Sequence, residues 1–151
     1  MTVLLSNLYY DDAEYNLPRV LQDNGYSTGM VGKWHLMTPS DDGNWFGCGD
    51  LQSSWSATLY AQCTGLVESA GFEYVDGWYH SNILENDDFS HNPEWMVSRA
   101  QHFIDTATQE NKPFFLYFAS TLVHSPDGGD ALQYHSSSWT PKGLFLSKIV
   151  K

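Results

Sequence analysis

Three side chains in this sequence could together hold an anion and move a proton: Lys33, His35 and His124. Residues two apart on an extended chain share a face, so Lys33 and His35 project together while Trp34 faces the other way. The ammonium group of a lysine can neutralise an oxyanion, and a histidine can give or take a proton near neutral pH. These residue types predict a site for an anionic substrate, with proton transfer at the same place.

Both groups follow segments that read as strands. Lys33 and His35 lie at the end of a strand predicted over Tyr26–Trp34, and His124 follows the apolar run Pro113–Ala119, which suits a strand buried on both faces. Ligands of open α/β sheets gather beyond the carboxyl ends of the strands, so parallel neighbours would bring the three side chains together. Taken singly, a lysine at a strand end is usually solvated, and His124 could be a turn residue. The other histidines are expected on the surface or in loops: His80, His91, His102 and His135.

Two helices are predicted beside these strands. Asn16 can cap a short helix that ends at Gly25, with Pro18 in its first turn. Its expected buried stripe is Leu17, Val20 and Leu21. A second helix is expected to open at Asn92 and Pro93 and to end near Asn111. Its apolar residues at helical spacing are Met96, Val97, Ala100, Phe103, Ile104 and Ala107.

The order of these segments predicts an α/β fold, with a mostly parallel sheet flanked by helices. The core elements fall at about residues 15–38 and 92–127. Residues from about 39 to 90 are rich in Asp, Gly, Ser, Asn, Trp and Tyr, so we expect a loop-rich excursion there. Within the first strand, Gly29 and Gly32 allow a close approach of other backbone.

Composition narrows the range of partners. The chain has 151 residues, 42% of them hydrophobic, and its net charge of -11 disfavours nucleic acid and anionic lipid as partners. The same charge would repel an anionic substrate, so any anion site must be built locally from a few cations. No run is long enough for a membrane span, and the N-terminus lacks the features of a signal peptide. Cys48 and Cys63 could form a disulfide, but their spacing leaves the pairing open.

Three stretches resemble the sulfatase family. Residues Leu17–Leu36 resemble its second signature, a Leu-Pro helix followed by Gly-Tyr-x-Thr and Gly-Lys-Trp-His. Gly71–Tyr74 with Gly77 resembles the family's Gly-Phe-Asp segment, and Lys112–Tyr117 followed by His124 resembles its Lys-Pro-Phe-Phe-Leu strand and histidine. The order and approximate spacing of the three stretches agree with the family.

The resemblance implies an alkaline-phosphatase-like sandwich that hydrolyses sulfate esters, on either a small molecule or a sulfated glycan. In that family the lysine matching Lys33 binds the sulfate, and the histidine matching His35 bonds to the hydroxyl of the nucleophile. The histidine matching His124 contacts the sulfate and assists the leaving oxygen. Fixed donors and a positioned acid lower the barrier because charge builds on the sulfate and leaving oxygens during the reaction. The family also implies a calcium ion and a secreted or lumenal location.

The chain departs from the family at the nucleophile. Family members carry Cys/Ser-x-Pro-x-Arg, whose first residue becomes formylglycine, and neither Cys48 nor Cys63 stands in such a motif. No calcium ligands can be assigned, because Asp11-Asp12 and Asp87-Asp88 are poorly placed, and Lys142 is not a secure match for a second sulfate-binding lysine. We therefore expect residues 1–151 to be an incomplete sulfatase catalytic domain that is inactive by itself, since loss of a nucleophile removes most of the catalysis.

Two other functions remain open at this point. Six Trp and nine Tyr could make a secreted glycan-binding module, in which aromatic rings stack on sugars. Alternatively, the chain could be a pseudoenzyme whose Lys33, His35 and His124 bind sulfate without hydrolysing an ester. Stabilisation by sulfate that is lost on Lys33→Ala would favour the pseudoenzyme over the glycan-binding module.

Overall fold

The computed structural model describes residues 16–34, 57–80, 92–120, 137–140 and 142–146. Three helices and five strands lie in these ranges. In chain order they are α1 (Leu17–Asp23), β1 (Ser27–Lys33), α2 (Ala57–Glu68), β2 (Tyr74–Tyr79), α3 (Pro93–Gln109), β3 (Phe114–Ala119), β4 (Ser137–Thr140) and β5 (Gly143–Leu146).

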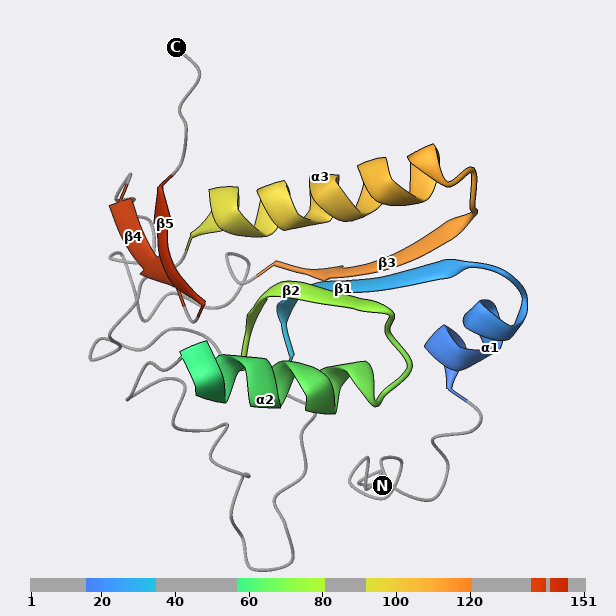
Figure 1. The fold of residues 1–151 in the computed structure, drawn as a ribbon, viewed down its shortest axis with the longest axis horizontal. Helices are drawn as coiled ribbons and strands as arrows, with labels where there is room; N and C mark the ends of the chain where they lie inside the picture. The colour runs from blue at the N-terminus through green and yellow to red at the C-terminus, as the bar shows by residue number, and fades with distance from the viewer. Residues whose placement is uncertain (1–15, 35–56, 81–91, 121–136, 141, 147–151) are drawn as a thin grey trace, which may run out of the picture.

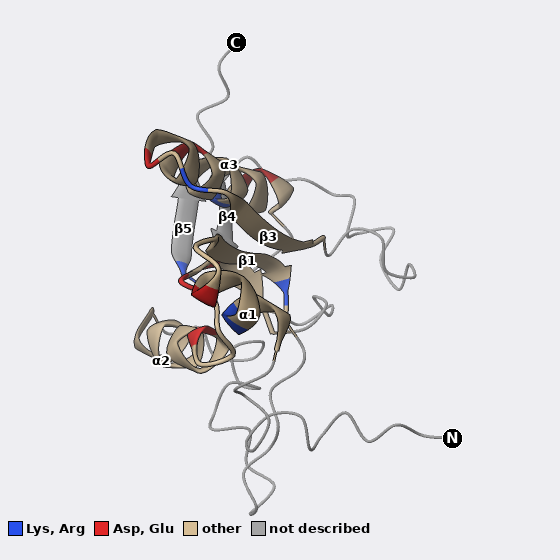
Figure 2. Ribbon diagram, turned by 90° about the vertical axis from the view of Figure 1, so that its right-hand side faces the viewer, with Lys and Arg blue, Asp and Glu red and all other residues tan. Residues whose placement is uncertain are grey.

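A parallel sheet forms the centre of the described fold. Its strand order is β2-β1-β3, and β1 pairs in parallel with both neighbours. Helix α3 covers one face of the sheet, while α1 and α2 lie on the other (Figures 1 and 2). β4 and β5 make a separate antiparallel hairpin, which lies at the end of the sheet where β1, β2 and β3 finish (Figure 1). The predicted α/β fold with a parallel sheet flanked by helices is confirmed and is consistent with a partial alkaline-phosphatase-like domain.

β1 is the buried central strand, and its glycines are required by close neighbours. A Cβ on Gly29 would come within 2.9 Å of the Phe103 ring on α3. Gly32 has a φ of +101°, and a Cβ there would collide with the carbonyl oxygen of Ala119 on β3. The close approach predicted at Gly29 and Gly32 is confirmed, because α3 and β3 occupy the space that side chains would need.

Helix α1 forms as predicted, but its buried stripe was predicted wrongly. The Asn16 side chain accepts a hydrogen bond from the backbone N–H of Arg19 at 3.0 Å, and Gly25 has a φ of +82°. Leu17 and Val20 are nevertheless 57% and 44% exposed. A helix of only seven residues at the end of the sheet overlaps little of its face, so these side chains extend beyond the covered surface (Figure 1).

The segment predicted as a loop-rich excursion contains α2 and β2, which is a correction. β2 joins the sheet and buries most of its residues, and α2 packs on it through Tyr60, Cys63 and Val67. On α2, apolar residues such as Leu59, Ala61 and Leu66 also lie beside the buried positions, and β2 carries Asp76 and Gly77 in its middle. Neither sequence therefore shows a clear periodic pattern. Tertiary packing, not local propensity, makes these elements.

The bounds of helix α3 agree with the prediction. The set of residues that it buries differs from the predicted set on one side of the helix. Asn92 caps it by accepting a hydrogen bond from the backbone N–H of Trp95 at 2.9 Å. Val97, expected to be buried, is 45% exposed, whereas Trp95 is 2% exposed and belongs to the core. The buried face is therefore rotated toward Trp95. Its members are Trp95, Met96, Ala100, Phe103 and Ala107.

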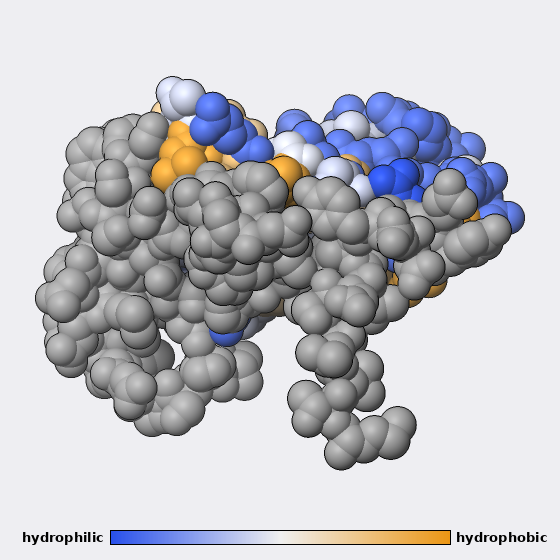
Figure 3. Space-filling view, turned by 90° about the horizontal axis from the view of Figure 1, so that it is seen from below, coloured by the Kyte–Doolittle hydropathy of each residue, from blue (hydrophilic) through white to orange (hydrophobic). Residues whose placement is uncertain are grey.

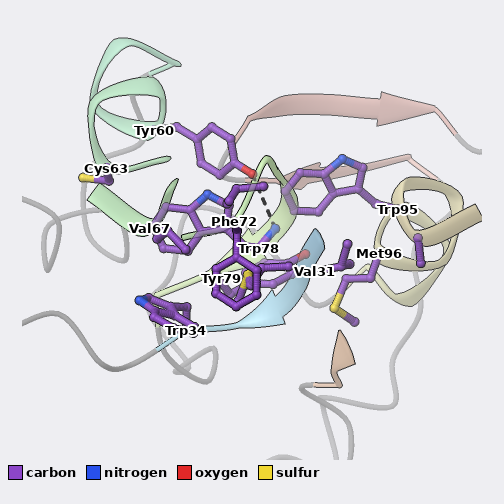
Figure 4. Packing of buried hydrophobic residues seen from close by; sticks show 13 residues of the cluster. Val31, Trp34, Tyr60, Cys63, Val67, Phe72, Trp78, Tyr79, Trp95 and Met96 are labelled. Carbon is purple, nitrogen blue, oxygen red and sulfur yellow. Dashed lines mark hydrogen bonds between the residues drawn. The ribbon is translucent and has the colours of Figure 1, made fainter. Parts of the chain in front are cut away.

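Aromatic side chains dominate the core (Figure 4). Tyr60 stacks on Trp78 with ring centroids 5.4 Å apart, and its hydroxyl oxygen accepts a hydrogen bond from the backbone N–H of Trp78 at 3.4 Å. Tyr79 packs edge-on against Trp95. Cys63 is fully buried on α2 and is disulfide-bonded, and the chain's other cysteine, Cys48, lies outside the described residues. The core thus joins α2, β2 and α3.

β3 was expected to be buried on both faces, and this is wrong for the described structure. It occupies the edge of the three-stranded sheet beside β1. Phe114, Tyr117 and Phe118 keep about 41% to 42% of their surface exposed. An edge strand has a neighbouring strand on one side only, which explains the partial burial.

None of the described helices is long and apolar enough to span a bilayer.

Candidate functional site

The structure confirms the sheet geometry on which the predicted site depends. Lys33 is the last residue of β1, and Ala119 is the last residue of β3. The strands run in parallel, and Gly32 is the register partner of Ala119. The carboxyl ends of β1 and β3 therefore lie side by side at one edge of the sheet.

The two histidines of the predicted site lie outside the described residues. His35 is two positions after Lys33, and His124 is five positions after Ala119. Both chain segments leave the sheet at the same edge, because the strands that precede them end there together. The convergence of Lys33, His35 and His124 on one pocket stays a prediction.

Trp34 fixes the backbone between Lys33 and His35. Its backbone N–H donates to the carbonyl oxygen of Tyr79 at 2.8 Å, which ties the end of β1 to β2. Its indole ring is 7% exposed and meets Phe72 and Tyr117 edge-on, with ring centroids 5.6 and 6.0 Å apart. Since Trp34 points into this aromatic cluster, Lys33 before it on the extended chain projects to the opposite side.

Lys33 differs from the other lysines that the structure describes in its ion pairs with described residues. Among the lysines that the structure describes, Lys112 pairs with Glu110 at 2.9 Å and Lys142 pairs with Asp76 at 2.7 Å. Lys33 is partly buried and makes no ion pair with any described residue. In a chain of net charge -11, a cation at a strand end that no described carboxylate pairs with is a local exception to the overall field.

Asp76 forms the centre of a polar cluster that sequence reasoning missed. Its carboxylate accepts a hydrogen bond from the N–H of Gly77 at 2.8 Å and lies 3.8 Å from Arg99 on α3. The Tyr60 hydroxyl donates to it at 3.4 Å, and Lys142 holds the β4–β5 hairpin to it. The register of β1 and β2 shifts at this point, and the Asp-Gly pair in a strand is the sequence signal for such a bulge. Lys142, considered above as a second sulfate-binding lysine, forms an ion pair with Asp76 in this cluster.

Burial and Asp76 together change the acidity of nearby phenols. Burial raises the pKa of Tyr60 well above its ordinary value, and the Asp76 carboxylate raises it further. Burial, with a smaller contribution from Asp76, raises the pKa of Tyr74 to about 12. These phenols remain neutral at physiological pH and act as hydrogen-bonding and packing groups.

Two of the remaining histidines are described. His102 is exposed on α3, as predicted, and lies against Tyr74 with ring centroids 6.0 Å apart. His80 was expected on the surface or in a loop; it lies just after β2 and is only 7% exposed, so it is not a surface residue. His80 follows β2 without an intervening turn, and the burial of β2 carries it into the interior. His91 and His135 lie outside the described residues.

The described residues do not supply a metal site. No three His, Cys, Asp or Glu side chains lie together in that part of the chain. Asp11-Asp12 and Asp87-Asp88 lie outside it. Within the described ranges, the residues therefore do not form a set of ligands for a calcium ion.

An aromatic sugar-binding platform receives no support from the tryptophans whose burial the structure describes. Trp34, Trp78 and Trp95 are between 0% and 7% exposed. All three pack against other aromatic rings inside the core. Rings enclosed in this way cannot stack on a ligand, so they stabilise the fold.

Comparison with known proteins identifies similar sequences. The family model described as Sulfatase matches residues 10–143 of the chain. The chain is 32% identical over 125 residues to arylsulfatase J of Mus musculus, covering 73% of this chain and 19% of that protein. It is 27% identical over 146 residues to arylsulfatase A of Bos taurus, covering 82% of this chain and 27% of that protein. It is 25% identical over 115 residues to a sulfatase of Escherichia coli strain K12, YidJ, covering 72% of this chain and 22% of that protein. The chain thus spans about a fifth to a quarter of the length of these relatives.

Proposed function

The chain belongs to the sulfatase family, and we propose that Lys33, His35 and His124 form the sulfate-binding part of a site that hydrolyses sulfate esters. The substrate class is a sulfate ester of a small molecule or of a glycan. We further propose that residues 1–151 form only part of the catalytic domain, so that this polypeptide binds sulfate without turning over an ester.

The adjacent carboxyl ends of β1 and β3 are the observation that carries this proposal. Lys33 ends β1 directly beside the end of β3, from which the chain continues to His124. Lys33 is also free of ion pairs with other described residues, in contrast to Lys112 and Lys142. A strand end with a cation that no described carboxylate neutralises is suited to hold a sulfate group.

Each residue has a distinct role in the proposed chemistry. The ammonium group of Lys33 stabilises the negative charge that builds on the sulfate oxygens in the transition state. His35 forms a hydrogen bond to the hydroxyl of the nucleophile and thereby orients it. His124 contacts the sulfate and supplies a proton to the departing oxygen, which avoids the release of an alkoxide. The nucleophile itself has no match in this sequence, so catalysis requires polypeptide beyond these residues.

The disulfide at Cys63 supports the proposal that the protein functions in a secreted or lumenal compartment. Disulfides persist in oxidising environments and are rare where thiols are kept reduced. Reduction in the presence of a thiol reagent should therefore lower the thermal stability of the chain.

Thermal unfolding in sodium sulfate tests the sulfate site. A ligand that binds the native state stabilises it by RT ln(1 + [L]/Kd), or about 2.7 kcal/mol at a hundredfold excess over Kd. We expect sulfate to raise the Tm above that in sodium chloride of equal ionic strength, and Lys33→Ala to remove the difference. Lys112→Ala is the matched control, because Lys112 is an exposed lysine already paired with Glu110. Equal losses in the two variants, or no stabilisation by sulfate, would contradict the proposal.

Turnover of 4-nitrophenyl sulfate tests the inactivity of the polypeptide alone. We expect no hydrolysis above the rate of the Lys33→Ala variant, because the nucleophile motif is absent from the sequence. Hydrolysis that depends on Lys33 would overturn the claim of inactivity while retaining the site.

A further inference from the structure

Two tyrosines attach β2 to α3, one at each end of the strand. At the start of β2 the hydroxyl of Tyr74 donates a hydrogen bond to the carbonyl oxygen of Arg99 at 3.0 Å. At its end the hydroxyl of Tyr79 accepts a hydrogen bond from the backbone N–H of Asn92 at 3.2 Å. The two contacts are similar in kind, but Tyr79 lies at the edge of the sheet where the proposed site is, and Tyr74 lies at the opposite edge.

The side chain of Tyr79 has a fixed position at the start of α3. Its ring is 1% exposed and meets Trp95 edge-on, with ring centroids 5.4 Å apart. Asn92 is the N-cap of α3 and is also 1% exposed, and Trp95 lies in the first turn. The ring and the hydroxyl of Tyr79 thus both contact residues at one helix terminus, which holds the end of β2 in place.

The backbone of Tyr79 in turn holds the end of β1. Its carbonyl oxygen accepts a hydrogen bond from the N–H of Trp34 at 2.8 Å, and Tyr79 is the register partner of Lys33. Neighbouring strands lie about 4.8 Å apart, and paired residues point to the same face of the sheet. Since Tyr79 faces α3, Lys33 leaves the sheet beside it on that face. The Trp34 ring meets Phe72 and Tyr117 instead, which agrees with the alternation of side chains along β1.

The direction of a lysine side chain depends strongly on such support. Its ammonium group is carried on a flexible four-carbon chain, so a fixed backbone is needed to restrict where the charge lies. A group already held in its binding position loses less conformational freedom when a ligand binds, and the affinity is higher. Lys33 is partly buried and is the last residue of β1. The contacts that fix the end of this strand therefore also limit the positions open to the ammonium group.

We propose that Tyr79 is a positioning residue of the sulfate site. Its ring and hydroxyl are held by the start of α3, and its carbonyl oxygen holds the N–H of Trp34. The strand end that is fixed in this way directs Lys33 toward the sulfate, and Tyr79 itself does not contact the ligand. This inference rests on the proposed function, because it assumes that Lys33 binds the sulfate.

Tyr79→Phe and Tyr74→Phe form a matched pair of variants that tests the inference. Each substitution retains the ring and removes one hydroxyl that bonds to the backbone of α3 or of its N-cap. We expect Tyr79→Phe to raise the Kd for sulfate about fivefold, equivalent to about 1 kcal/mol, the usual net value of a hydrogen bond. Tyr74→Phe should leave the Kd unchanged. Isothermal titration calorimetry of the 151-residue chain with sodium sulfate measures both constants, and urea denaturation compares the stability of the two variants.

Amide hydrogen exchange at Trp34 tests the route by which Tyr79 acts. The Trp34 N–H should exchange faster in Tyr79→Phe than in the parent chain and remain unchanged in Tyr74→Phe, because the oxygen that accepts it belongs to Tyr79. In the parent chain, saturating sodium sulfate should slow this exchange, since the coupling between two sites is reciprocal. The N–H of Ser27, which bonds to the carbonyl oxygen of Pro113 at the start of β1, is the internal reference.

Three outcomes would overturn the inference. They are equal Kd values for the two variants, a Trp34 amide that exchanges at the same rate in both, and sulfate that slows the Trp34 amide no more than that of Ser27. The last measurement uses the parent chain, so it decides the question even if Tyr79→Phe does not fold. Sulfate binding that Lys33→Ala removes and Tyr79→Phe does not weaken would contradict this inference alone. Binding that is absent, or that survives Lys33→Ala, would contradict the proposed function and with it the role of Tyr79.

Discussion

At the scale of single residues, the predicted site depends on three consecutive positions, residues 33 to 35, that have different roles. Lys33 and His35 carry the chemistry proposed for the chain, and Trp34 between them is committed to packing. Trp34 is held by Tyr79 through its backbone and by Phe72 and Tyr117 through its ring. The same residue therefore stabilises the fold and determines the side to which Lys33 projects.

Replacement of Trp34 should affect both properties. We expect Trp34→Ala to lower the free energy of unfolding by about 3 to 5 kcal/mol, as for other buried aromatic residues. The variant should also lose most of its stabilisation by sulfate. Trp34→Phe retains an aromatic ring and should lose less of both. Urea denaturation with and without sulfate measures the two effects. A Trp34→Phe variant that is destabilised but binds sulfate as tightly as the parent chain would show that Trp34 does not position the site.

At the scale of elements, helix capping and side-chain packing each contribute to the stability of α3. Asn92 is 1% exposed, accepts a hydrogen bond from Trp95 N–H and donates its own backbone N–H to the Tyr79 hydroxyl at 3.2 Å. The start of α3 is thereby tied to the end of β2. Helix α3 in turn covers the sheet from β2 to β3 and contributes the ring that requires Gly29.

Removal of this cap should weaken the fold measurably. We expect Asn92→Ala to lower the free energy of unfolding by about 1 kcal/mol or somewhat more, the usual cost of losing a helix N-cap. Asn92→Ser should retain more of the stability than Asn92→Ala, because the serine hydroxyl oxygen can also accept from the Trp95 N–H without burying a charge. Gln101→Ala, on the exposed side of α3, is the control, since glutamine and alanine have similar helix propensities. Chemical denaturation that finds Asn92→Ala no less stable than Gln101→Ala would contradict this assignment.

At the scale of the whole molecule, a buried aromatic core is combined with an acidic and partly hydrophobic surface. The described residues with large exposed hydrophobic side chains are Leu17, Val20, Tyr26, Val97, Phe114, Tyr117 and Phe118. Figure 3 shows hydrophobic patches open on the face that it presents. Such surface favours association with other polypeptide. The interior of the fold, in contrast, contains the side chains of Tyr60, Tyr74 and Tyr79, whose phenol groups stay protonated at neutral pH.

Stability should fall at alkaline pH because of these phenols. Burial raises the pKa of Tyr60 and of Tyr79, and burial with Asp76 raises that of Tyr74 to about 12. In the unfolded chain a tyrosine loses its proton near pH 10. Above that pH the unfolded state binds fewer protons than the native state, so the free energy of unfolding decreases as pH rises from about 10 to 12. Below pH 10 both states are protonated and this contribution is fully present.

Denaturant titrations at several pH values, with tyrosinate absorbance recorded in parallel, measure this effect. Tyr60→Phe should reduce the alkaline dependence, because it removes one of the buried ionisable phenols while retaining a ring against Trp78. Titration of every tyrosine near pH 10 in the folded protein would contradict the prediction.

Local features of the fold could be predicted from the sequence. The caps at Asn16 and Asn92, the strand at Ser27–Lys33 and the need for glycine at position 32 all depend on neighbouring residues or on backbone geometry. The position of Lys33 at a strand end followed from the same local patterns. β2 and α2 were missed, because their hydrophobic periodicity is weak and they become ordered through contacts with distant segments.

The sequence by itself determined the family, the helices α1 and α3, the strands β1 and β3, and the residue types of the proposed site. Only the tertiary structure decided that β1 is central, that β3 lies at the edge of the described sheet, and that Asp76 gathers Arg99 and Lys142. The physical reason is the sequence separation between the residues that interact. Helix capping and strand formation depend on a few consecutive residues, whereas strand order, burial and ion pairs depend on which distant segments fold against each other.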